Sequence, residues 1–304
     1  MISLIICTYN RDKYIYNTLA HLANNTITKC DYEIVLINNN CTDNTESECL
    51  RFVNDYPDVR FHYFVERRQG LSYARNKGIE ESEGDDIIFL DDDAFVECEY
   101  LENTKMWLSK YPDVAAWGGR ITPLFEAGYP PKWWGSKWTV PWVSAIDLGS
   151  EAWMFDKQYP IGANMGVRKS VVDSVGLFNT GLGRSKKNLM AGEEKDFFNR
   201  IKSMGGKIYY FPNINVQHVI PESRTTKNYI IRLGYGVGCS ERLRCRSISG
   251  SMFVRRCMME FVKWCGTLVL WFYYLITIRP IIGNYLILFR WHVSRGLVGV
   301  RELV

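Results

Sequence analysis

The stretch Asp86-Ile-Ile-Phe-Leu-Asp-Asp-Asp93 joins four consecutive apolar residues to three consecutive aspartates. The apolar run predicts a fully buried strand. The three aspartates form a charged cluster at the end of this strand. Adjacent carboxylates repel one another, and a bound divalent cation such as Mg²⁺ or Mn²⁺ relieves that repulsion most simply. The alternative is that Asp93 only caps the next helix, which we expect near Glu99 to Lys110.

Upstream of this stretch, the chain repeats a unit of strand, polar loop and helix. We expect strands at 2–7, 34–37 and 61–65. We expect helices at 13–23, from the end of the loop at 38–43 to about 54, and at 71–81. Repeated units of this kind predict an α/β fold with a parallel sheet covered by helices. Ligands of such sheets bind beyond the carboxyl ends of the strands, where the polar loops at 8–12, 38–43 and 91–93 would converge.

Composition narrows the class of protein. The chain has 304 residues, of which 47% are hydrophobic and 23% charged, as expected for a globular protein. Nine cysteines form no CxxC pair, which predicts reduced thiols in a cytosolic protein. No Gly-x-Gly-x-x-Gly or Walker loop follows the first strand, which argues against dinucleotide-binding and P-loop enzymes. The short apolar run at the start does not have the pattern of a secretory signal, so we expect none.

Charge is distributed unevenly along the chain. Residues 224–304 carry 13 Lys and Arg against 3 Glu, whereas residues 1–223 carry 24 against 30. Within this basic part, the uncharged run 264–278 and the apolar run 281–289 are each shorter than the roughly 20 residues that span a bilayer. We therefore expect an interfacial helix at an anionic membrane surface rather than a spanning helix or a nucleic-acid site. Residues 235–238, with two glycines, predict a flexible turn.

Several short motifs together resemble the family 2 glycosyltransferases of the GT-A fold, as found in bacterial surface-polysaccharide synthesis. The resemblance covers about residues 2–220. Its motifs, in order, are Cys7-Thr-Tyr-Asn-Arg11, Asn38-Asn-Asn-Cys-Thr-Asp-Asn-Thr45, Gly70-Leu-Ser-Tyr-Ala-Arg-Asn-Lys-Gly78, Phe89-Leu-Asp-Asp-Asp93, Gly162-Ala-Asn-Met-Gly-Val-Arg168, Gly176-Leu-Phe178, Gly192-Glu-Glu-Lys-Asp196 and Arg200.

The resemblance implies a site for the nucleotide-sugar donor. Thr8, Asn10 and Asn38 would hold the base, where the family usually has Asp in place of Asn38; uridine is the favoured base. Arg75 would pair with the diphosphate or orient the aspartates. Asp91 and Asp92 would bind the ribose and position Mn²⁺ or Mg²⁺.

The resemblance also implies metal ligands and an acceptor side. Asp93 would coordinate the metal with Asp91, and His218 resembles a histidine that reaches the metal in some relatives, although a packed histidine is the alternative. Glu194 would be the catalytic base, with Asp196 as the second choice and a helix N-terminus near 194 as the structural alternative. Glu193 would also bind the acceptor. The tryptophans Trp133, Trp134 and Trp138 would line an acceptor groove by stacking on sugar rings; the alternative is that they only anchor a packed loop.

Taken together, the sequence predicts a GT-A domain at 1–223, with a nucleotide-sugar half at 1–120 and an acceptor half at 121–223, and a basic helical tail at 224–304. We expect a metal-dependent inverting glycosyltransferase that moves a sugar from a UDP-linked donor to a glycan or lipid-linked acceptor. It would work in the cytoplasm at the inner face of the cell membrane. A sugar-1-phosphate nucleotidyltransferase and a non-catalytic nucleotide-sugar or membrane-binding module remain as alternatives.

Overall fold

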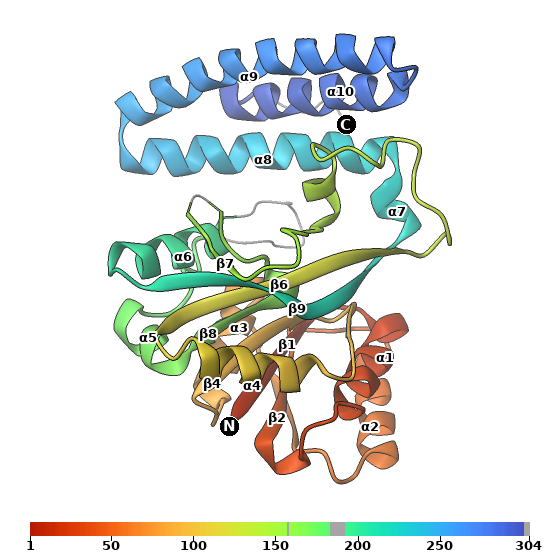
Figure 1. Cartoon of the computed structure of the whole chain (residues 1–304), viewed down its shortest axis with the longest axis vertical. Coiled ribbons are helices and arrows are strands. Elements are labelled where there is room, and N and C mark those ends of the chain that lie inside the picture. Colours follow the sequence, from red (N-terminus) through yellow and green to blue (C-terminus); the bar gives the residue numbers. More distant parts are fainter. Residues whose placement is uncertain (157, 183–191, 301–304) are drawn as a thin grey trace. The chain divides into compact units, whose positions relative to one another are not determined.

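A computed structural model describes residues 1–156, 158–182 and 192–300 of the chain (Figure 1). These residues form two compact units, the first built from 1–124, 144–182 and 193–219 and the second from 125–143, 192 and 220–300. The second unit therefore includes 125–143 as well as nearly all of the predicted tail. Residues 157 and 183–191 of the predicted acceptor half and 301–304 of the tail lie outside the described residues.

Four parallel strands form one side of the sheet in the first unit. They follow the order β3-β2-β1-β4, and β1 is the central pairing partner of both β2 and β4. Thr8 lies opposite Asn38, and Cys7 lies opposite Asp91, so the polar ends of three strands reach the same edge. The elements are β1 Ile2–Thr8, α1 Asp12–Ala23, η1 Lys29–Asp31, β2 Tyr32–Asn38, α2 Thr45–Asp55, β3 Phe61–Val65, α3 Leu71–Glu81 and β4 Asp86–Asp91. The predicted α/β units are thus confirmed.

The sheet continues beyond β4 through β8, β6, β9 and β5, and β7 pairs with β9. The pairs β4–β8, β6–β8, β5–β9 and β7–β9 are antiparallel, so the nine-stranded sheet is mixed. These elements are β5 Ala94–Val96, α4 Tyr100–Lys110, β6 Val114–Phe125, β7 Trp153–Met154, η3 Gly162–Asn164, β8 Met165–Arg168, α5 Lys169–Val175, α6 Glu193–Ser203 and β9 Lys207–Ile220. His218 lies within β9, two residues before the strand ends at Ile220.

Helices cover both faces of this sheet, as alternating residues of its central strand require. Leu4 and Ile6 of β1 belong to a core that includes side chains of α1, α2 and α4, whereas Ile5 faces a second core with side chains of α3, α5 and α6. Both faces of the strand are buried. Burial on both sides explains why β1, β2 and β4 are continuous apolar runs, which is the pattern that identified them.

The second unit is dominated by three long helices. They are α8 Lys227–Ile248, α9 Gly250–Ile276 and α10 Pro280–Val298, preceded by the short η2 Val140–Val143 and α7 Glu222–Thr225. Figure 1 shows α10 against both α8 and α9. None of the helices in the described ranges has the length and apolar character needed to cross a membrane.

The predicted turn at 235–238 is wrong, because these residues lie inside α8. Their glycines serve close packing instead. A Cβ atom on Gly238 would lie 2.1 Å from the Val293 carbonyl oxygen of α10, and one on Gly296 would lie 2.2 Å from the Tyr235 carbonyl oxygen. The backbones of α8 and α10 therefore touch at these glycines, which have no side chain to keep them apart. Glycine is required here for close contact rather than for flexibility.

This contact predicts opposite effects for two glycine substitutions within helices. Gly238→Ala should destabilise the protein by about 1 to 3 kcal/mol, since the new methyl group meets the backbone of α10. Gly266→Ala in α9, where a Cβ atom meets nothing within 4 Å, should stabilise it by up to about 1 kcal/mol through helix propensity. Denaturant unfolding of the two variants measures both values, and an equal effect of both substitutions would contradict the packing account.

Candidate active site

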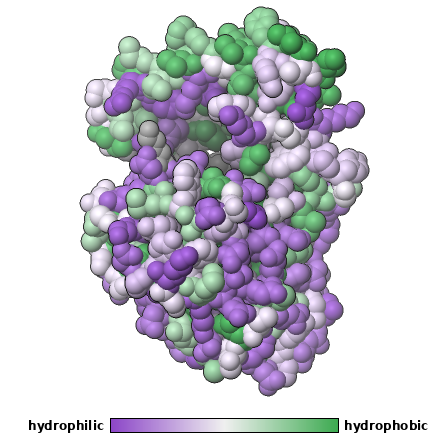
Figure 2. Space-filling model, viewed as in Figure 1, coloured by the Kyte–Doolittle hydropathy of each residue, from purple (hydrophilic) through white to green (hydrophobic). Residues whose placement is uncertain are grey.

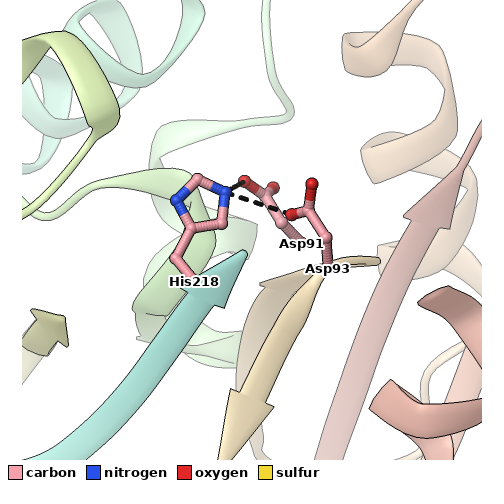
Figure 3. Close-up of side chains that lie close together, drawn as sticks. All are labelled: Asp91, Asp93 and His218. Atoms are coloured by element: carbon pink, nitrogen blue, oxygen red, sulfur yellow. Dashed lines mark ion pairs between the residues drawn. The ribbon is translucent and has the colours of Figure 1, made fainter. Parts of the chain in front are cut away.

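Two aspartates and a histidine meet at the carboxyl end of β4, where Asp91 ends the strand, Asp93 lies in the turn before β5, and His218 comes from β9 (Figure 3). His218 Nε2 lies 3.1 Å from Asp93 Oδ1 and 3.8 Å from Asp91 Oδ2. The sheet fixes this arrangement: Ala94 of β5 lies opposite His218 of β9, and the Val219 N–H donates to the Asp93 carbonyl at 2.9 Å. One ligand atom from each side chain lies within 4.8 Å of the other two, a spacing that a single ion can bridge.

The chemistry of this cluster fits a hard divalent cation. His218 is 1% exposed, and neither ring nitrogen has a hydrogen-bond partner within the described ranges. Carboxylate oxygens suit Mn²⁺ or Mg²⁺, and the imidazole nitrogen beside them favours Mn²⁺, a transition-metal ion, over Mg²⁺. The capping alternative for Asp93 is wrong, because β5 separates it from α4, which begins only at Tyr100.

A cation of the protein, Arg11, also faces the aspartates. Its Nε lies 3.6 Å from Asp92 Oδ1, and its Nη2 lies 3.4 Å from Asp93 Oδ2. Burial and the adjacent Asp93 carboxylate raise the pKa of Asp92 above its usual range, and Arg11 opposes them. Sequence reasoning did not assign Arg11 a role, although an arginine directly after the first strand, opposite three aspartates, was the available signal.

Of the residues predicted to bind the nucleotide base, Thr8 and Asn38 end β1 and β2, and Asn10 lies in the loop after β1. Asn10 adopts a left-handed backbone conformation (φ 54°), and its Oδ1 accepts from the Thr42 N–H at 2.7 Å, which ties the two loops together. Asn38 donates from Nδ2 to Tyr63 Oη at 2.6 Å and accepts at Oδ1 from the Cys41 N–H at 2.7 Å. The amide thus acts in both senses at this position, while Thr8 is buried beside it in the sheet register.

A buried ion cluster joins α3 to α6. Arg75, 2% exposed, donates from Nη1 to Glu193 Oε1 at 3.2 Å and from Nη2 to Glu194 Oε1 at 2.9 Å. Gly162 closes the cluster, since a Cβ atom there would lie 2.2 Å from both Arg75 Nη2 and Glu194 Oε1. The structure therefore places Arg75 against Glu194, the predicted catalytic base, and the sequence did not suggest this partner.

The electrostatics of Glu194 connect it with the aspartates. Burial raises the pKa of Glu194, Arg75 lowers it, and Glu193 and Asp91 raise it again, so the pKa stays above its ordinary value. The influence of Asp91 means that the carboxylates of β4 and α6 lie in one electrostatic neighbourhood although they are about a hundred positions apart. The helix alternative for Glu194 also holds, because α6 begins at Glu193.

Comparison with known proteins identifies the family. Residues 3–176 match the family model described as glycosyl transferase family 2. The chain belongs to this family. As a glycosyltransferase, it uses a nucleotide-sugar donor, and the nucleotidyltransferase alternative is set aside.

Individual relatives of this glycosyltransferase act in glycan synthesis. It is 27% identical over 248 residues to the glucosyl-dolichyl phosphate glucuronosyltransferase of Haloferax volcanii, which covers 80% of this chain and 76% of that protein. It is 29% identical over 139 residues to the poly(ribitol-phosphate) β-N-acetylglucosaminyltransferase TarP of Staphylococcus aureus, covering 42% of this chain and 41% of the relative.

Solved structures confirm the GT-A-like fold of the glycosyltransferase. The mannosyltransferase PcManGT of Pyrobaculum calidifontis, solved with GDP-Man and Mn²⁺, superposes with a TM-score of 0.65 at 16% identity, over 99% of this chain and 88% of that chain. GalNAc-T7 with UDP, GalNAc and Mn²⁺ gives a TM-score of 0.54 at 18% identity, over 79% and 48%. Both of those structures contain Mn²⁺, and the two aspartates predicted to bind a metal, Asp91 and Asp93, lie together in this protein.

The remaining predicted residues of the glycosyltransferase have different surroundings. Asp196 accepts from Arg200 Nε at 3.1 Å within α6. Trp133, in the second unit, is buried, donates to the Thr225 carbonyl at 3.0 Å and packs against Trp142, so the packed-loop alternative describes it. Trp134 is half-buried and Trp138 is exposed. Thus only Trp138 presents much of its ring for stacking.

The buried ion cluster makes a prediction about stability. Arg75→Met should lower the free energy of unfolding by about 3 to 5 kcal/mol near neutral pH, because two carboxylates lose their buried cation. Without Arg75 the pKa of Glu194 in the folded state, which burial already raises above its ordinary value, rises further. The deficit should therefore be larger at about pH 8 than at about pH 5, where protonation removes the charge.

Denaturant unfolding at the two pH values tests this prediction. Lys207→Met is the matched control, since it removes a cation from an exposed pair with Asp113 and should leave the free energy of unfolding nearly unchanged. A deficit for Arg75→Met that is equal at both pH values would show that lost packing, not lost charge, is responsible.

Proposed function

We propose that this protein is a metal-dependent, inverting glycosyltransferase that uses a nucleoside diphosphate sugar. The observation that carries the proposal is the cluster of Asp91, Asp93 and His218 at the carboxyl edge of the sheet, in the same compact unit as Glu194. A divalent ion held by these three side chains would neutralise the diphosphate as it leaves. Asp92 would contact the ribose, and Arg11 would hold the aspartates in place.

Glu194 is proposed as the general base. Its carboxylate accepts the proton of the acceptor hydroxyl as that oxygen attacks the anomeric carbon, and the bond from that carbon to the diphosphate breaks on the opposite face. Attack from the face opposite the leaving group inverts the configuration. A pKa above the ordinary value of a glutamate makes Glu194 a stronger base, and the bond from Arg75 fixes its direction.

For the donor we propose a uridine nucleotide, held by Thr8, Asn10 and Asn38. For the acceptor we propose a glycan or lipid-linked sugar in the synthesis of a cell-surface polysaccharide, at the inner face of the cell membrane. Relatives that act on dolichyl phosphates and on poly(ribitol-phosphate) support an acceptor of this kind. The basic composition of residues 224–304 supports the location.

Calorimetry with a panel of UDP-, GDP-, dTDP- and CMP-sugars tests the donor. With Mn²⁺ present, we expect one nucleotide to bind, and we expect the binding to disappear when EDTA removes the metal. Asp93→Ala should abolish metal-dependent binding in the same way. Binding that is unchanged by EDTA and by Asp93→Ala would contradict the metal-dependent site.

Transfer kinetics test the base. Glu194→Gln should bind the donor normally but transfer at least about 100-fold more slowly, as expected for the loss of a general base. Asp196→Asn is the control, because Asp196 is bonded to Arg200 within α6 and should tolerate the change. If Asp196→Asn is the slower of the two variants, Asp196 rather than Glu194 is the base. Normal donor binding with no transfer by the unmodified protein would favour the non-catalytic module.

A further inference from the structure

The helix α9 has an unusual distribution of side chains. Its exposed side is apolar over most of its length, with Phe261 at 72% exposed and Ile276 at 80%. Figure 2 shows apolar side chains gathered over this helix. The exposed large apolar residues of α9 are Val254, Met258, Met259, Phe261, Val262, Leu268, Val269, Phe272, Tyr273, Leu275 and Ile276.

The buried side of α9 is polar. Glu260 is 5% exposed, where it accepts from Arg256 Nη1 at 2.7 Å and from Arg290 Nη1 of α10 at 3.1 Å. Thr267 and Tyr274 are buried on the same side. A surface helix in water shows the reverse pattern, with apolar residues inside and charges outside. The outer side of α9 is therefore built for contact with an apolar medium rather than with water.

The exposed charged residues between 250 and 300 are all positive. Glu260 is the only acidic residue between 250 and 300, and it is buried in its pairs with Arg256 and Arg290. Arg255, Lys263 and Arg279 are exposed. Cations beside an apolar helix face match a surface that is hydrocarbon within and anionic at its boundary, which is an anionic lipid bilayer.

We propose that the outer side of α9 inserts into one leaflet of an anionic bilayer, with the helix lying along the membrane plane. The helix would lie along the leaflet rather than cross it, since no helix in the described part of the chain is suited to crossing a bilayer. Exposed aromatic rings at Phe272, Tyr273 and, on α10, Trp291 suit the boundary between headgroups and hydrocarbon. Membrane insertion of α9 would bring the protein to the lipid-linked acceptor of the proposed function, but the experiments below measure membrane binding and need no transferase activity.

Alkylation of native cysteines tests the proposal on the unmodified full chain. Cys265 is exposed on α9, whereas Cys30 and Cys98 are exposed in the first unit. Vesicles of phosphatidylglycerol and phosphatidylcholine should slow the alkylation of Cys265 by at least about tenfold, since a thiol within the leaflet is shielded from an aqueous reagent. Cys30 and Cys98 should keep their rates. Unchanged alkylation of Cys265 on vesicles that bind the protein would overturn the assignment to α9.

Two matched triple variants test the same face by vesicle sedimentation. Phe261→Gln with Val269→Gln and Phe272→Gln should lower the partition coefficient by at least about tenfold, because three large apolar side chains no longer enter the leaflet. The control combines Leu50→Gln, Val53→Gln and Met106→Gln, which are exposed apolar residues of the first unit. It should bind like the unmodified chain. All six positions are exposed, and circular dichroism of both variants confirms that they fold.

Two further outcomes separate the bilayer from other occupants. Binding should weaken when the vesicles contain only phosphatidylcholine and when salt is raised from about 0.1 to about 0.5 M, as expected for attraction between cations and anionic lipid. Light scattering should find no dimer that depends on Phe261, Val269 and Phe272. A dimer dissolved by the α9 substitutions, together with unchanged vesicle binding, would assign this face to a second copy of the chain instead.

Discussion

Repulsion among the carboxylates of Asp91, Asp92 and Asp93 is the constraint around which the first unit is arranged. Asp92 and Asp93 are buried, where like charges lose the screening of water. In the described part of the chain, Arg11 lies on one side of them and His218 on the other, so one partly solvated arginine and one imidazole face three carboxyl groups. The divalent ion that we propose would complete the balance of charge, so a feature that is costly for folding would be directly useful for holding a diphosphate.

A second buried group of charges lies between α3 and α6, where one cation faces two carboxylates. There the protein supplies its own cation, because Arg75 is buried against Glu193 and Glu194. The arginine opposes the effect of burial on the pKa of Glu194 and fixes the direction of its carboxylate, and both effects suit the general base that we propose. In the second unit, Glu260 is satisfied in the same manner by Arg256 and Arg290, and that pairing leaves the outer side of α9 without acidic groups.

Much of the fold was predictable because both faces of β1, β2 and β4 are covered by helices. Strands that are buried on both faces have continuous apolar sequences, which can be recognised without the structure. The contacts made across the sheet were not predictable. The length of β9 and the short β5 follow from pairing with each other, and that pairing brings His218 to Asp93. Arg75 meets Glu194 through tertiary packing, with no local signal. The glycines of α8 predicted a turn because a glycine needed for helix contact looks like any other glycine until α10 is in place.

The most direct test of this account is pulsed electron paramagnetic resonance of Mn²⁺ in the presence of the nucleoside diphosphate that the protein binds. The account predicts one bound Mn²⁺ ion with a nitrogen coupling from an imidazole, and loss of that coupling in His218→Ala, since His218 Nε2 faces Asp91 and Asp93. Bound Mn²⁺ with oxygen ligands alone in the unmodified protein would contradict the proposed ligand set. No bound Mn²⁺ at all would contradict the metal-dependent mechanism itself.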